Sequence, residues 1–216
     1  MNLEGPNLVV YAGGMAGGKT GQAILEMQRI SEGTHYRVKV FQPKNAVREG
    51  IDKGKPTIVS RTQLSFAATI IPENDPREIL RQISRPDLFI LIDEAHMFTH
   101  PQGLKEVVET LLDQRKNVHA VTLTTDYGGR MFPITSYLLG RASDAKFYHG
   151  FCSEPGCTRP ANHSQLYKKG MFAAYQGAKL FTGDIKEGDI TYKIRCLDHF
   201  EIPPNAPGFK EGVLTL

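Results

Sequence analysis

The distribution of hydrophobic and polar residues predicts alternating strands and helices. The segments "NLVVYAGG" and "DLFILID" have the length and apolar character of buried strands, and "RVKVFQP" alternates like a strand. "HAVTLTT" is a further strand, and "TIVSR" is a shorter candidate. Residues 19–32, 75–83 and 103–116 have the apolar spacing of helices, and the second begins with Asp75 as N-cap and Pro76 at its first position. Because strands and helices alternate, we expect an α/β fold built on a parallel sheet with helices on both faces.

The pattern changes near His149. From Phe151 onward Cys, Pro, Gly, Lys and Tyr occur in short irregular runs without a convincing helix. We therefore expect a first domain at residues 1–148, a small loop-rich unit at 149–203 and a C-terminal tail at 204–216.

Composition adds only weak constraints. The chain has 216 residues, of which 40% are hydrophobic and 23% charged, as in ordinary soluble globular proteins. A net charge of +3 gives no support for a nucleic-acid partner. No apolar run approaches the roughly 18 residues of a membrane helix, and the N-terminus has no signal-peptide pattern. A cytoplasmic protein that binds neither membrane nor nucleic acid is expected.

A glycine-rich stretch follows the first predicted strand. "GGMAGGKT" fits the phosphate-loop pattern G-x-x-x-x-G-K-[ST], and a helix follows it as that motif requires. Such a loop holds phosphate oxygens with its backbone N–H groups, its lysine and the helix N-terminus, while its hydroxyl residue binds Mg²⁺. The predicted ATP-binding residues are Gly13, Gly14, Met15, Ala16, Gly17, Gly18, Lys19 and Thr20.

The strand "FILID" ends in an acidic pair, Asp93 and Glu94. Asp93 has the position of a Walker B carboxylate, which assists Mg²⁺ together with Thr20 and belongs to the ATP site. The letters "DEAH" also name a helicase family, but a helicase of that kind needs two motor domains and only 123 residues follow Asp93. The interpretations that remain are a small-molecule kinase and a shorter P-loop ATPase.

Six segments in the same order resemble the zinc-containing (class II, cytosolic-type) thymidine kinase family over almost the whole chain. The family reads G-P-M-F-S-G-K-T beside "GGMAGGKT", D-E-A-Q-F-F beside "DEAHMF", and G-L-D-x-D-F-R-G-E-P-F beside "TLTTDYGGRMF". Its S-R-x-G, A-x-x-[ST]-Q and Y-x-x-x-C-R-x-[CH] are approximated by "SRTQ", "ANHSQ" and "YKIRCLDH". The resemblance implies ATP- and Mg²⁺-dependent phosphorylation of the 5′-hydroxyl of a pyrimidine deoxynucleoside, thymidine foremost. It also implies Glu94 as general base, a homotetramer, and feedback inhibition by thymidine triphosphate.

The second unit contains two close pairs of metal-ligand residues. "CSEPGC" and "CLDH" place Cys152, Cys157, Cys196 and His199 as C-x₄-C, a gap of 38 residues, and C-x₂-H. Three thiolates and an imidazole suit a tetrahedral structural Zn²⁺. The x₄ spacing is wider than the family's usual C-x-x-C, so His163 and His149 are kept as fallback ligands. The alternative is three buried thiols and a surface histidine.

The resemblance also suggests where a nucleoside would bind, under a lasso loop carried by a zinc-ribbon unit. Tyr127 stands where the family's aromatic residue stacks on the base. The further predicted substrate-binding residues are Phe132, Thr182, Gly183, Tyr192 and Met97.

Several positions depart from the family pattern near the expected base pocket. His96 replaces Gln, Met97 replaces Phe, Thr124 replaces Asp, and Ala46 stands where P-x-x-D-x-R has its Asp. Phosphate and metal positions are kept while base-facing ones vary. The departures suit either a divergent thymidine kinase or a kinase for a modified pyrimidine nucleoside. A P-loop ATPase or nucleotide-binding module without kinase activity is the competing interpretation.

Overall fold

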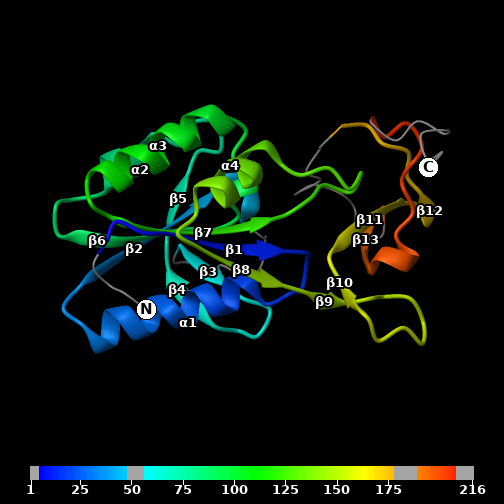
Figure 1. The fold of residues 1–216 in the computed structure, drawn as a ribbon, viewed down its shortest axis with the longest axis horizontal. Coiled ribbons are helices and arrows are strands. Elements are labelled where there is room, and N and C mark those ends of the chain that lie inside the picture. The colour runs from blue at the N-terminus through cyan, green and yellow to red at the C-terminus, as the bar shows by residue number, and fades with distance from the viewer. Residues whose placement is uncertain (1–4, 48–55, 178–188, 208–216) are drawn as a thin grey trace.

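A computed structural model describes residues 5–47, 56–177 and 189–207 of the chain. Figure 1 shows a larger α/β part joined to a smaller part built from short strands. Within the described residues, no helix has both the length and the apolar character needed to span a bilayer.

Six parallel strands form the central sheet, in the spatial order β5-β2-β6-β7-β1-β8. The four main strands expected from the sequence are all present. The sheet strands are β1 (Leu8–Gly13), β2 (Arg37–Pro43), β5 (Thr69–Ile71), β6 (Asp87–Ile92), β7 (Asn117–Leu123) and β8 (Asp144–Tyr148).

The segment "TIVSR" is a strand, but it lies outside this sheet. Its first three residues form β3 (Thr57–Val59), which pairs antiparallel with β4 (Ser65–Ala67). A tight turn over residues 60–64 joins them, closed by a hydrogen bond from the Ser60 N–H to the Leu64 carbonyl at 2.8 Å. The hairpin packs beside α1 (Lys19–Gly33), the helix that follows the phosphate loop.

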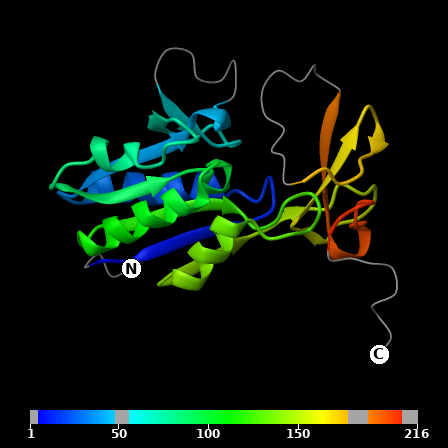
Figure 2. The same cartoon turned by 90° about the horizontal axis from the view of Figure 1, so that it is seen from above.

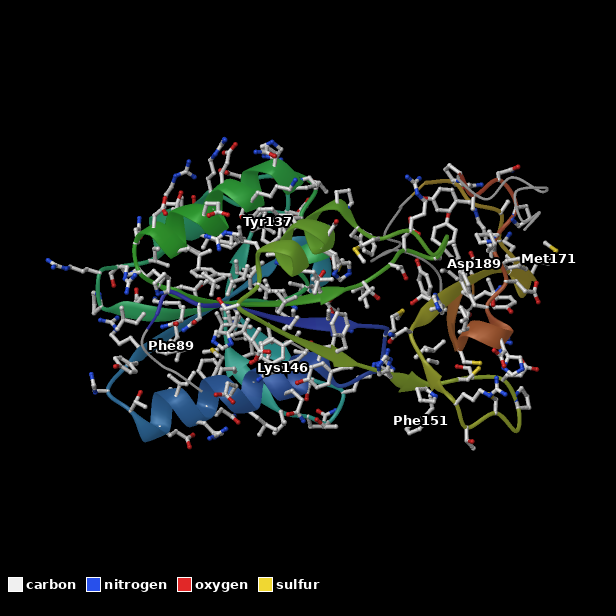
Figure 3. The ribbon with its side chains drawn as sticks, in the orientation of Figure 1. Phe89, Tyr137, Lys146, Phe151, Met171 and Asp189 are labelled. Atoms are coloured by element: carbon white, nitrogen blue, oxygen red, sulfur yellow. The ribbon has the colours of Figure 1, made fainter. Side chains whose placement is uncertain are left out.

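Helices cover both faces of the sheet, as predicted. In Figure 1, α1 lies below the strands, and α2 (Glu78–Gln82), α3 (Pro101–Asp113) and α4 (Pro133–Arg141) lie above them. Side chains of a strand alternate between faces, so β1 contributes Leu8, Val10 and Ala12 to the layer under α3 and Val9 and Tyr11 to the layer over α1. Phe89 of β6 points into the α1 layer (Figure 3). Two apolar layers therefore fix the sheet.

The expected start of the second helix is wrong. Asp75 is not its N-cap, because α2 begins at Glu78 with Arg77 as the capping residue. The Asp75 carboxylate instead accepts a hydrogen bond from Arg81 at 3.1 Å, and its carbonyl accepts one from the Glu78 N–H at 3.2 Å. Residues 75–77 thus form a turn that precedes the helix.

The second part contains more regular structure than its sequence indicates. Residues 150–195 include a two-stranded ladder and a three-stranded antiparallel sheet in the order β12-β11-β13. The strands are β9 (Gly150–Phe151), β10 (Pro160–Ala161), β11 (His163–Lys168), β12 (Met171–Phe172) and β13 (Ile190–Arg195). We keep the division into 1–148, 149–203 and 204–216 as a proposal, with residues 208–216 of the tail outside the described ranges.

Parallel strands bring the predicted chemistry to one edge of the sheet. The strands β1, β7 and β8 point toward the second part, and Figure 2 shows it at the same end of the molecule. The phosphate loop follows β1 there, and Asp93 follows β6. Loops at the carboxyl ends of parallel strands are the usual location of binding sites in such sheets.

Candidate functional site

The phosphate loop folds back on itself between β1 and α1. Gly13 and Gly18 have φ angles of 141° and 86°, and Ala16 has φ 56°, so the backbone repeatedly enters the left-handed half of conformational space. The buried Lys19 ammonium donates to the Gly14 carbonyl at 2.5 Å and so bends back across the loop. Burial lowers the pKa of Lys19, and the charges of Glu94 and Asp93 oppose that shift. The lysine is placed for a bound polyanion.

Two glycines of this loop lie directly against the end of β8. A Cβ at Gly13 would overlap the carbonyl oxygen of Tyr148, and one at Gly17 would lie 2.9 Å from the same atom. A side chain at either position would push the loop away from the sheet. The loop is therefore held against a strand that the sequence pattern did not predict.

Asp93 lies buried at the centre of the site. Its Oδ1 accepts a hydrogen bond from the Thr20 hydroxyl at 3.2 Å, and its Oδ2 accepts one from the Gln42 amide at 3.3 Å. Burial, together with the charge of Glu94, raises the pKa of Asp93 to about 7. A cation beside this carboxylate would favour its ionised form. The adjacent Thr20 and Asp93 oxygens thus fit a hard cation such as Mg²⁺, which prefers oxygen ligands.

Glu94 has a left-handed backbone, with φ 49° and ψ 44°. This conformation costs a non-glycine residue about 1–3 kcal/mol, and such residues are enriched at functional sites. It turns the chain sharply after β6, so Glu94 follows Asp93 without sharing its contacts with Thr20 and Gln42. The two carboxylates therefore occupy different surroundings.

His96 lies near Glu94 without forming an ion pair. Its Nδ1 is 3.6 Å from Glu94 Oε2, but the same nitrogen accepts a hydrogen bond from the Leu123 N–H at 3.2 Å and so carries no proton. Burial lowers the pKa of His96 to about 4. The short distance therefore joins a neutral ring to a carboxylate.

His96 and Met97 belong to the short helical turn η2 (Ala95–Met97), and both are buried. The His96 ring packs against Phe132, with centroids 5.0 Å apart. The Met97 carbonyl accepts a hydrogen bond from the Asn45 amide at 2.9 Å. His96 and Met97 are thus already in contact with Phe132 and Asn45 near the predicted base pocket. Contact of Met97 or Phe132 with a substrate stays a prediction.

Tyr127 ties the loop after β7 to the second part. Its hydroxyl accepts a hydrogen bond from the Gln176 N–H at 2.7 Å, and its ring lies 5.1 Å from that of Tyr175. The Tyr175 hydroxyl donates to Asp126 Oδ2 at 2.7 Å, while Asp126 Oδ1 accepts two backbone N–H groups of its own turn. Residues on both sides thus hold Tyr127 in place.

The remaining predicted substrate residues lie in the second part. Tyr192 is on β13, in register with Leu166 of β11. Thr182 and Gly183 lie outside the described residues, so the predicted lasso contacts stay predictions.

Three cysteines and a histidine come together in the second part. Cys152, Cys157, Cys196 and His199 place their ligand atoms within 4.8 Å of one another. Cys152 follows β9, and Cys157 closes a turn on Glu154. Cys196 immediately precedes the short helix η3 (Leu197–His199), and His199 is the last residue of that helix. The cluster is the one predicted from the sequence, and it includes neither His149 nor His163.

The spacing of these atoms fits a tetrahedral zinc ion. Bond lengths of about 2.3 Å to sulfur and 2.0 Å to nitrogen imply separations of roughly 3.8 Å between sulfurs and 3.5 Å between sulfur and nitrogen. Cys157 and Cys196 sulfurs are 4.0 Å apart, and His199 Nδ1 is 3.5 Å from Cys152 and 3.3 Å from Cys196. The residues could therefore hold Zn²⁺ with little rearrangement.

The Cys152 thiol is already disposed to lose its proton. Burial alone would raise its pKa, but hydrogen bonds from the backbone of Cys196 and Glu154 and from His199 lower the pKa to about 6. A thiolate is the form that binds zinc.

Sequence reasoning missed three contacts of the site. Gln42 holds Asp93, Asn162 accepts a hydrogen bond from the Gly14 N–H at 3.0 Å, and Asp126 anchors Tyr175. Gln42 carries a usable signal, because it is the polar residue nearest the carboxyl end of a strand in which polar and apolar residues alternate. Asn162 carries none, since it occupies a variable position of the segment "ANHSQ" and nothing in that segment points to the loop.

Comparisons with known proteins agree with this geometry. A sequence model described as thymidine kinase matches residues 6–196. A thymidine kinase from Pyrobaculum aerophilum is 29% identical over 198 residues, covering 91% of this chain and 100% of the relative. Thymidine kinases from Thermococcus kodakarensis and Mycoplasmoides gallisepticum are 28% and 27% identical, covering 91% and 88% of this chain and 94% and 79% of theirs.

One solved structure is less similar. The genome packaging NTPase B204 of Sulfolobus turreted icosahedral virus 2, in complex with sulfate, gives a TM-score of 0.42 at 15% identity and covers 72% of this chain and 78% of its own. A likeness at this level supports no conclusion about this chain.

The family match extends through the phosphate loop, the acidic pair and all three cysteines. It covers most of the chain, and three relatives with the same name agree with it. The chain therefore belongs to the thymidine kinase family, a family of nucleoside kinases.

Proposed function

We propose that this chain transfers the γ-phosphoryl group of ATP to the 5′-hydroxyl of a pyrimidine deoxynucleoside, with thymidine as the leading acceptor. One observation carries the proposal. Lys19 and Thr20 of the phosphate loop meet Asp93 and Glu94 at the carboxyl ends of β1 and β6. Phosphoryl transfer requires this combination of phosphate binding, metal binding and a carboxylate near the nucleophile.

The phosphate loop would bind and orient ATP. Backbone N–H groups of residues 13–20 and the N-terminus of α1 supply donors and a positive dipole end, and Lys19 adds a full charge. Thr20 and Asp93 are the residues that would hold Mg²⁺, which neutralises phosphate charge when it is bound. Gln42 keeps the second Asp93 oxygen in place through its hydrogen bond.

Glu94 would accept the proton of the 5′-hydroxyl. Its side chain is 22% exposed, whereas Asp93 is buried, so Glu94 is the more accessible of the two carboxylates. A positioned general base typically contributes a factor of about 10²–10⁴ to the rate. The neutral His96 beside it forms no ion pair that would occupy the carboxylate.

The nucleoside would lie between the loop after β7 and the second part. Tyr127 would stack on the base, with Phe132 and Met97 on the side of the α/β part. Tyr192, Thr182 and Gly183 would contact it from the second part. The hydrogen bond between Tyr127 and Gln176 supports this arrangement, because it brings the two sides together.

A nucleoside panel tests the proposal. The chain is incubated with γ-labelled ATP and Mg²⁺, alone and with thymidine, deoxyuridine, 5-substituted deoxyuridines or deoxycytidine, and labelled monophosphate is measured. We expect label in thymidine monophosphate and little ADP without nucleoside. Preference for a 5-substituted analogue would identify a kinase for a modified nucleoside. ADP formation at one rate in every tube would instead indicate an ATPase.

A further inference from the structure

The phosphate loop is contacted from outside its own domain. The Oδ1 atom of Asn162 accepts a hydrogen bond from the backbone N–H of Gly14 at 3.0 Å. Asn162 is the single residue between β10 and β11, so it belongs to the unit that carries the cysteines. The contact is close, because a Cβ at Gly14 would lie 2.7 Å from the Cα of Asn162.

A second contact lies beside the first. A Cβ at Gly150 would be 3.0 Å from the carbonyl oxygen of Met15. Gly150 pairs with Ala161 in the β9–β10 ladder, and Asn162 directly follows Ala161 in the chain. The end of this ladder therefore lies directly against residues 14 and 15 of the loop.

The same ladder leads into the metal-ligand cluster. Cys152 is two residues beyond Gly150, and its backbone N–H bonds to the Arg159 carbonyl at 3.0 Å, continuing the ladder. Residues that hold the cluster together thus also hold the surface on which the loop rests.

Gly14 connects Asn162 to Lys19. Its N–H is bound by Asn162, while its carbonyl oxygen accepts the hydrogen bond of the Lys19 ammonium at 2.5 Å. A shift of Gly14 would therefore move the acceptor that orients Lys19. The family motif has Pro where Gly14 stands, and Pro has no N–H to donate. The hydrogen bond depends on this chain's own glycine.

We propose that Asn162 is a positioning residue for the phosphate loop, through which the second unit sets the affinity for ATP. The proposal rests on the ATP-dependent function proposed above. Asn162 contacts no phosphate-binding side chain itself, so its effect passes through Gly14 to Lys19. Loss of the contact weakens ATP binding without altering the nucleoside site.

The test compares Asn162→Ala with Asn162→Asp. The dissociation constant of a fluorescent ATP analogue is measured without nucleoside, and KM is measured for ATP and for thymidine. We expect Asn162→Ala to raise both ATP constants about five- to tenfold, as for loss of one hydrogen bond. The KM for thymidine should stay within about twofold. Asn162→Asp keeps the acceptor oxygen but adds a negative charge beside the phosphate site, so its recovery of ATP affinity relative to Asn162→Ala is measured at high ionic strength, where that charge is screened.

Ser153→Ala is the matched control. The Ser153 hydroxyl also accepts a backbone N–H, that of Ile194 at 3.2 Å, but the bond lies within the second unit. Zinc content and unfolding are measured for every variant. Should Asn162→Ala fold poorly, Asn162→Leu removes the acceptor while keeping a similar side-chain volume and takes its place.

The experiment distinguishes failure of the role of Asn162 from failure of the proposed function. Unchanged ATP constants in Asn162→Ala, or an equal rise in Ser153→Ala, would overturn the positioning role. No rescue by Asn162→Asp would also count against it. Absence of transfer from ATP in the wild-type protein would refute the proposed function, whereas the dissociation constants would still decide the role of Asn162.

Discussion

The Nδ1 atom of His96 accepts a hydrogen bond from the backbone N–H of Leu123 at 3.2 Å. This bond joins the turn after β6 to the last residue of β7, on the edge of the sheet where Glu94 lies. The imidazole is buried and its pKa is lowered to about 4, so it is a neutral acceptor at physiological pH. His96 therefore links the turn after β6 to the end of β7 by a hydrogen bond.

Replacing His96 by residues with and without an acceptor tests this role. The amide oxygen of His96→Gln can accept the Leu123 N–H, and Gln is the residue of the family motif. We expect its free energy of unfolding to fall by less than about 1 kcal/mol. His96→Leu leaves the Leu123 N–H without a partner and should cost about 1–3 kcal/mol. Urea unfolding of both variants gives the comparison, and equal losses would contradict the hydrogen-bond role.

Glu94→Gln should separate nucleotide binding from phosphoryl transfer. The substitution keeps the shape of the side chain but removes the proposed base, so we expect a loss of about 10²–10⁴-fold in single-turnover rate. Binding of the fluorescent ATP analogue should change little. Glu32→Gln, an exposed change at the end of α1, is the control. Near-normal transfer by Glu94→Gln would remove Glu94 from the role of base.

The metal cluster predicts about one zinc ion per chain. Cys157→Ser and His199→Ala should each lower zinc content strongly and reduce thermal stability, because the ion would link segments that are 38 or more residues apart in the chain. Elemental analysis of purified protein measures the content. His163→Ala is the comparison, since His163 stacks on Phe200 outside the cluster. Zinc loss in that variant alone would identify a different ligand set.

Asp126 connects the turn after β7 to Tyr175. Asp126→Ala removes the acceptor of two backbone N–H groups and of the Tyr175 hydroxyl, and should cost about 2–4 kcal/mol of stability. Tyr175→Phe removes one of the three bonds and should cost about 1 kcal/mol. Both should raise KM for the nucleoside more than KM for ATP, because Tyr127 is held by the same segment. Unfolding curves and steady-state kinetics check each expectation.

Because His119 is buried, we expect the free energy of unfolding to fall in acid. His119 lies in the core against Tyr11, whose hydroxyl is 3.1 Å from its Nδ1, and burial lowers its pKa to about 4. The unfolded chain binds this proton near pH 6.5, so the stabilising contribution is complete above that pH and declines as the pH falls toward 4. The loss at pH 5 is about 2 kcal/mol from this group.

His119→Gln isolates the contribution, because its side chain does not titrate. We expect the difference in unfolding free energy between wild type and variant to shrink by about 2 kcal/mol between pH 7.5 and pH 5. Other groups that titrate in this range affect both proteins and cancel in the difference. A constant difference across the range would show that His119 is protonated as easily in the folded protein as in the unfolded one.

Elements buried on both faces were predictable from the sequence. The strands β1 and β6 read as continuous apolar runs, and β7 between them is buried along most of its length although it contains Asn117, His119 and Thr122. The edge strand β8 was missed because most of it is exposed and its residues include Asp144 and Lys146. Helix α4, nine residues long, lacks a strong period and was missed as well. Partly exposed short strands explain the underestimate of regular structure in the second part.

The candidate site also contains residues that were predictable from the sequence and contacts that were not. Lys19 and Thr20 were predictable because the phosphate loop is continuous in sequence, and the cysteine pairs are two short local patterns. The contacts of Gln42 with Asp93 and of Asn162 with Gly14 join residues 51 and 148 positions apart. Only the tertiary fold determines such pairs, since no local pattern connects their members.

The order of strands constrains how the protein is made. In the sheet, β1 pairs with β7 and β8, so both of its neighbours come from much later in the chain, and the second is complete only when Tyr148 has been added. Such non-local pairing slows folding, because a long segment must be closed before the contacts form. The loop at residues 13–20 therefore acquires its surroundings only after the much later Tyr148 and Asn162, which lie against it, have been synthesised.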